Sequence, residues 1–83
     1  MRQRPTPHYY SISLVNDTYV TRQVSNYQYA LEDLNEVRQQ GGLPLCVYDV
    51  YDWRTDWQLS ELERTEHEKP IAELTNELRL KHE

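Results

Sequence analysis

Apolar and polar side chains alternate over residues 9–15 and again over 18–24. A period of two residues is typical of β-strands that bury one face, so the pattern predicts an antiparallel hairpin. A two-residue loop would set Val20 opposite Ser13 and would place the two apolar phases on opposite faces. We therefore expect a three-residue loop that sets Val20 opposite Ile12, with Asn or Asp in the left-handed conformation.

The pattern changes to a helical period over residues 26–40. Ser25 is expected to cap the first turn, because its hydroxyl can accept from an unpaired backbone N–H and Gln28 follows at capping-box spacing. Gly41 and Gly42 are expected to end the helix in a left-handed C-cap. The apolar positions between these ends recur at helical spacing: Tyr27, Ala30, Leu31, Leu34 and Val37.

Residues 43–53 are apolar in both phases of a strand. Their β-branched and aromatic content favours a third strand, near 45–52, that pairs with the hairpin. One face of this strand is expected to join the hairpin core, and the other to meet a further element or another chain. One phase holds Leu45, Val47, Tyr51 and Trp53, and the other holds Cys46, Tyr48 and Val50.

The C-terminal third of the chain favours helix, with Asp56 as its expected N-cap. The apolar positions form two groups that one straight helix could not bury together: Leu59 with Leu62, and Ile71 with Leu74 and Leu78. Pro70 lies between the two groups. We therefore expect two helices, 57–68 and 70–82, with Pro70 in the first turn of the second, where its missing N–H is harmless.

Together these elements predict an α+β fold of order ββαβαα, with a small three-stranded antiparallel sheet and helices packed on it. A length of 83 residues suits a single domain. We expect one domain over 1–83, with a flexible N-terminal arm at 1–7 and a C-terminal helical segment at 70–83. The single cysteine excludes an internal disulfide, and no export signal or membrane-length apolar run is visible, so we expect a cytoplasmic protein.

Charge is distributed unevenly along the chain. Over residues 1–42 acidic and basic residues balance, whereas over 49–68 the acidic residues outnumber the basic ones by five, which equals the formal net charge of −5. A concentration of carboxylates repels phosphate backbones and anionic membranes and attracts basic surfaces. The charge pattern therefore favours a basic partner.

Candidates for catalysis or metal binding are few. His8, His67 and His82 stand far apart in the sequence and match no metal-ligand spacing, so they are interpreted as surface residues. Cys46 lies among apolar neighbours without a nearby cation, which favours a small buried hydrophobe over a catalytic thiolate. Glycine-rich phosphate loops and nucleophile elbows are missing from the sequence. We expect no enzymatic activity, no cofactor and no metal site.

Residues 48–57 interleave tyrosine and tryptophan with aspartate. These aromatic residues contribute much of the binding energy at protein interfaces, and adjacent carboxylates select a basic partner. Tyr51 and Trp53 are expected to pack in the core. Tyr48 and Trp57 could either pack in the core or contact a partner. The residues predicted to bind a partner are Tyr48, Asp49, Asp52, Asp56, Trp57, Glu61 and Glu63.

These features favour a non-enzymatic acidic module that inhibits or regulates a larger protein by occupying a basic site that handles nucleic acid. Small acidic proteins act in this way among phage and mobile-element antagonists, anti-CRISPR proteins included. The comparison with them rests on size and charge.

Two other functions are considered. The first is a homo-oligomeric structural or regulatory protein, with a symmetric interface formed by the second apolar face of the third strand or by Ile71, Leu74 and Leu78. The second is a small DNA-binding regulator that joins Arg2, Arg4 and Arg22 in a dimer. The acidic net charge argues against direct nucleic-acid binding, because readers of nucleic acid gather lysine and arginine at the phosphates.

Overall fold

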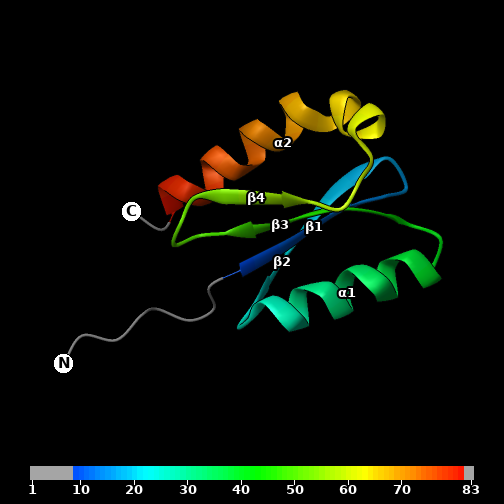
Figure 1. Cartoon of the computed structure of the whole chain (residues 1–83), viewed down its shortest axis with the longest axis horizontal. Helices are drawn as coiled ribbons and strands as arrows, with labels where there is room; N and C mark the ends of the chain where they lie inside the picture. Colours follow the sequence, from blue (N-terminus) through cyan, green and yellow to red (C-terminus); the bar gives the residue numbers. More distant parts are fainter. Residues whose placement is uncertain (1–8, 82–83) are drawn as a thin grey trace.

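A four-stranded antiparallel sheet lies between two helices, one on each face (Figure 1). The computed structural model describes residues 9–81, so the predicted N-terminal arm at 1–7 lies outside the described residues. The elements, in chain order, are β1 Tyr9–Val15, β2 Thr18–Val24, α1 Tyr27–Gln39, β3 Leu43–Asp49, β4 Arg54–Trp57 and α2 Glu61–Lys81. The strand order in the sheet is β2-β1-β3-β4. The α+β class is confirmed, but the predicted sheet is one strand too small.

The loop of the first hairpin was predicted with the wrong length. Asn16 and Asp17 form a two-residue turn with φ values of 50° and 63°, and Val20 lies opposite Ser13. The two-residue turn is tolerated because helices cover both faces of the sheet, so β1 is buried on both sides. β2 is an edge strand, and its Val20 is left 44% exposed.

Helix α1 begins one residue later than predicted. Its N-cap is Asn26 in place of Ser25, and the Asn26 side chain accepts a hydrogen bond from the Tyr29 N–H at 2.9 Å. Both residue types are good caps, since each offers a side-chain oxygen to the first turn. The end of the helix is confirmed: Gly41 has a φ of +88°, and the Gly42 N–H bonds the carbonyl of Val37 at 2.9 Å.

Strand β3 lies in the interior of the sheet, which explains why its sequence is apolar in both phases. Val47 packs toward α1 with Ala30 and Leu34, whereas Cys46 and Tyr48 belong to the core on the other side. A β-bulge shifts its pairing with β1. The second apolar face therefore meets another element of the same chain.

The expected third strand ends earlier than 52, because the chain turns over 50–53 and returns as β4. Strand β4 pairs with β3, and its Asp56 lies opposite Val47, so Asp56 is a strand residue and not a helix N-cap. β4 has only four residues, which is too short for an alternating pattern to stand out.

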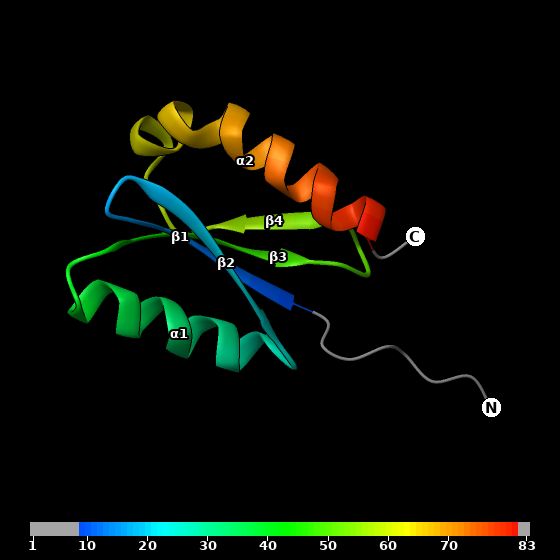
Figure 2. The same ribbon diagram turned by 180° about the vertical axis from the view of Figure 1, so that it is seen from behind.

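Two separate helices were also predicted, whereas the structure has one, α2, which includes Pro70 in its interior. The ribbon changes direction between the yellow and orange turns around this proline, as expected where a ring displaces a backbone hydrogen bond (Figures 1 and 2). As predicted, this one helix does not bury both apolar groups: Leu62 is 84% exposed, and Ile71 is 1% exposed. Leu59 precedes the helix and packs against the core.

The sheet lies between α1 and α2 (Figure 2). The buried apolar side chains form two cores. The larger one lies between the sheet and α2, and the smaller one joins Val47 to α1. The buried members of the larger core are Tyr10, Ile12, Leu45, Cys46, Tyr48, Val50 and Ile71.

Candidate functional site

The fold distributes the predicted partner-binding residues over four places, one of which is the α2 side of the sheet with Tyr48 and Trp57. Asp49 and Asp52 lie at the β3–β4 turn, which faces the C-terminal end of α2 (Figure 1). Asp56 lies on the α1 side of the sheet. Glu61 and Glu63 lie in the first turn of α2, at the other end of that helix. The continuous acidic segment of the sequence is therefore not one continuous patch.

At the β3–β4 turn, the Asp49 carboxylate holds the backbone. It accepts hydrogen bonds from the N–H groups of Tyr51 at 2.9 Å and Asp52 at 3.3 Å. Trp53 has a φ of 52° and is 38% exposed, with the Arg79 guanidinium 5.2 Å from its ring centroid. Trp53 was expected in the core; it is instead a surface residue, because the turn carries it out of the sheet.

Tyr48 and Trp57 lie on the α2 side of the sheet. Tyr48 is 3% exposed, and burial raises its pKa above the usual value for tyrosine. Trp57 is half-buried and packs against the same core. A partner could contact part of the Trp57 ring, whereas the Tyr48 side chain lies beneath the surface.

Asp56 is joined to α1 by a hydrogen bond from the Tyr27 hydroxyl. This bond, and next to it burial, raise the pKa of Tyr27. Asp56 is exposed and therefore remains open to further contacts. Its neighbours along β4 point to the other face, so Asp56 is separated from Trp57 by the thickness of the sheet.

The start of α2 carries a group of exposed carboxylates. Ser60 caps the helix, because its Oγ accepts from the Glu63 N–H at 3.4 Å, and the same Oγ donates to Glu63 Oε1 at 3.0 Å. Around this cap, Glu61, Leu62 and Glu66 are exposed. We call Glu61, Leu62, Glu63 and Glu66 the acidic helix surface. Leu62 and Glu66 are not among the predicted partner-binding residues, although the helical positions indicate that Leu62 could not be buried together with Ile71.

The apolar stripe predicted as an oligomer interface packs within the chain. Ile71 is buried in the larger core, and Leu74 and Leu78 pack against that core as half-buried residues. The need to cover this stripe is therefore met by the chain's own sheet. Self-association stays a prediction that no observation here tests.

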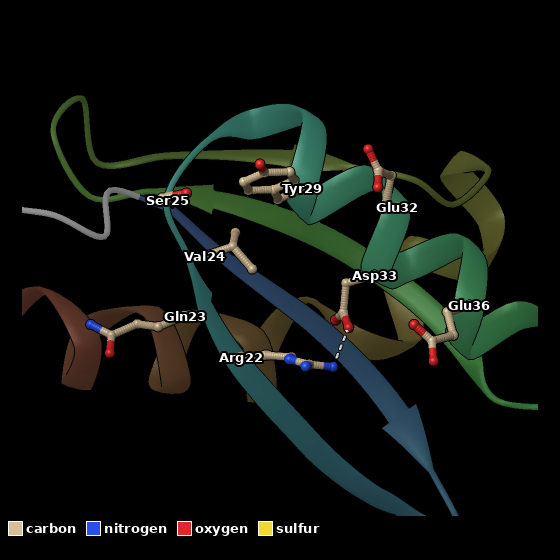
Figure 3. Close-up of a pocket in the computed structure, with 8 residues that line it drawn as sticks. All are labelled: Arg22, Gln23, Val24, Ser25, Tyr29, Glu32, Asp33 and Glu36. Carbon is tan, nitrogen blue, oxygen red and sulfur yellow. Dashed lines mark hydrogen bonds and ion pairs between the residues drawn. The ribbon is translucent and has the colours of Figure 1, made fainter.

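A groove of about 410 Å³ lies between β2 and α1 (Figure 3). Arg22 of β2 reaches Asp33 of α1, with 2.8 Å between its nitrogen and the carboxylate, and Asp33 also accepts from the buried Ser11 hydroxyl. Tyr29, Glu32 and Glu36 stand along the α1 side of the groove. The pattern of residues in the sequence did not predict this groove, because its two walls come from elements that the fold brings together.

Reactive groups do not gather at any of these places. Cys46 is buried, and burial, followed by the nearby Asp56, raises the pKa of its thiol to about 12, which disfavours the thiolate. Among residues 9–81, no three histidine, cysteine or acidic side chains converge as metal ligands would. Neither described helix combines the length and the apolar character that a membrane crossing requires.

Comparisons with protein-family models, with curated proteins and with solved structures found no match for this chain.

Proposed function

We propose that the chain is a non-enzymatic binding module that docks its acidic helix surface on a basic site of a larger protein. The observation that supports this proposal is the exposure of Glu61, Glu63 and Glu66 around an 84% exposed Leu62. Arg64 pairs with Glu68 at 3.4 Å, and none of these three carboxylates forms an ion pair within residues 9–81. Leu62 would enter an apolar depression, and the carboxylates would face a basic rim.

A module that occupies a basic site on a larger protein could regulate that protein. Basic surfaces on large proteins commonly hold phosphate backbones, and an array of carboxylates can take the place of phosphates. A module bound there would compete with nucleic acid and so inhibit the larger protein. Phage and mobile-element antagonists are the class of protein for which this mode of action is expected from size and charge.

The proposal is tested with charge variants on two halves of one helix. Glu61→Gln with Glu66→Gln removes carboxylates from the acidic helix surface and leaves the Ser60–Glu63 hydrogen bonds intact. Glu73→Gln with Glu77→Gln removes the same charge from exposed positions beyond Pro70 and serves as the matched control. The tagged chain captures its partner from a lysate, and binding is then measured with the purified partner.

The expected result is a slower association and a flatter salt dependence for the first variant only, because attraction over a distance is screened within about 8 Å at physiological ionic strength. Added duplex DNA should displace the wild-type chain from its partner. Equal binding by both double variants, or binding that DNA does not affect, would contradict the proposal.

A further inference from the structure

Among residues 9–81, strand β2 pairs with another strand along one edge only, where it meets β1. It is an outer strand of the sheet, seven residues long, with the sequence Thr-Tyr-Val-Thr-Arg-Gln-Val. Natural edge strands are commonly protected by shortness, lysine, proline or a bulge, and β2 has none of these. Its single cation, Arg22, is held by Asp33 at 2.8 Å. The backbone of β2 is therefore available for pairing.

The turn determines which backbone groups face the open edge. In a two-residue turn with both φ values positive, the flanking residues Val15 and Thr18 form a hydrogen-bonded pair. Along the hairpin, hydrogen-bonded pairs then alternate with pairs that are not hydrogen-bonded. The N–H and C=O groups of Tyr19, Thr21 and Gln23 consequently point away from β1. The backbone groups of these three residues can therefore form hydrogen bonds with an additional strand.

The surroundings of this edge indicate the charge of that strand. The groove beside β2 is lined by Glu32, Glu36 and Tyr29, which is 54% exposed (Figure 3). Glu32 and Glu36 form no ion pair with any residue from 9 to 81. Arg22 and Asp33 neutralise each other. The side chains of an added strand would alternate between the two faces, so that every second one would enter the groove.

We propose that the β2 edge accepts an extended basic segment of another protein as an additional strand, with lysine or arginine at alternate positions above Glu32 and Glu36. Backbone pairing would give affinity, and the carboxylates would select the residues in the groove. A second copy of this chain fits less well, because a symmetric β2–β2 pairing would place the α1 carboxylates of both copies on the same side of a shared sheet. This docking surface is distinct from the acidic helix surface, and either can fail without the other.

The probe is a short synthetic peptide that alternates lysine and threonine over the length of β2. Its control is a peptide of equal composition with lysines and threonines in adjacent pairs, which places only half of the cations on each face of a strand. Binding is measured by fluorescence anisotropy, and backbone amide exchange is measured by NMR. The alternating peptide should bind more tightly, and the amides of Tyr19, Thr21 and Gln23 should gain protection from exchange.

Two double variants separate the groove from general charge attraction. Glu32→Gln with Glu36→Gln should weaken binding of the alternating peptide by about fivefold, as expected for two exposed ion pairs. Glu73→Gln with Glu77→Gln, and likewise Glu61→Gln with Glu66→Gln, should leave it unchanged. Thr21→Pro removes an outward N–H and should abolish binding; circular dichroism of this variant shows whether its fold is kept.

Three results would overturn the proposal. One is peptide binding without new protection at Tyr19, Thr21 and Gln23. Another is an equal loss of affinity in all three charge variants, which would show attraction by net charge alone. The third is protection of these amides without peptide, together with a concentration-dependent mass in light scattering, which would identify a second copy as the occupant.

Discussion

At the scale of single residues, the turns depend on positions with positive φ. Asn16, Asp17 and Gly41 are residue types that tolerate the left-handed region, whereas Trp53 does not favour it. Trp53 is held there by the Asp49 hydrogen bonds across the turn and by the Arg79 guanidinium over its ring. Local chemistry therefore fixes three of these positions, and contacts with a distant helix support the fourth.

Gly41→Ala tests the cost of the left-handed cap directly. No atom lies within 4 Å of the Cβ that the substitution would add, so the change introduces backbone strain without a clash. We expect a loss of about 1 kcal/mol in the free energy of unfolding. The measurement is urea denaturation, with Gln40→Ala as the control, and equal midpoints for the two variants would contradict the expectation.

At the scale of elements, α2 carries two different roles on its two halves. The turns after Pro70 bury Ile71 on the sheet, and the turns before it expose Leu62 and the carboxylates. The Tyr19 hydroxyl lies 2.9 Å from His67 Nδ1, which links the first half of the helix to β2. Contacts on both sides of Pro70 thus explain why the helix continues through a residue that costs about 3 kcal/mol in a helix interior.

Ile71→Ala and Leu62→Ala should separate these roles. Truncation of the 1% exposed Ile71 should lower the free energy of unfolding by roughly 2–5 kcal/mol, because it leaves a cavity in the larger core. Truncation of the 84% exposed Leu62 should change it by no more than about 0.5 kcal/mol. Chemical denaturation measures both, and similar losses for the two variants would show that the exposed half of α2 is packed after all.

At the scale of the whole molecule, the sheet is covered on both faces, and Cys46 is buried between the layers. Its thiol has a pKa of about 12 in the folded chain, against 9.0 for an unperturbed thiol. Above pH 9 the unfolded chain therefore releases a proton that the folded chain keeps. Stability is fully present below pH 9 and decreases as the pH rises toward 12. Burial raises the pKa of Tyr10 and Tyr48 as well, which adds to the same trend above their ordinary value of 10.0.

The urea midpoint should consequently be constant from pH 7 to about pH 8.5 and lower at pH 10, a window set by the thiol. Cys46→Ala should have a lower midpoint throughout because it leaves a cavity, but a flatter pH dependence between 9 and 10. A wild-type midpoint that does not fall between pH 8 and pH 10 would refute this account.

Short-range pattern was sufficient for a large part of the fold. Periodicity, caps and composition predict the strands 9–15 and 18–24, the central helix with its glycine end, and the burial of Cys46. These features depend on residues within one or two turns of each other, where backbone sterics and local hydrogen bonds decide the conformation. The sequence also determined the excess of acidic residues and the mismatch between Leu62 and Ile71.

Only the tertiary structure decided which of these features lie together. Helices on both faces of the sheet stabilise the two-residue hairpin, the short strand β4 and the unbroken α2. The local sequence pattern does not indicate that both faces are covered. The same arrangement separates Asp56 from Glu61 and forms the groove between Arg22 and Glu36. Burial is a property of the assembled layers, so the surfaces available for binding depend on packing between elements that are distant in the sequence.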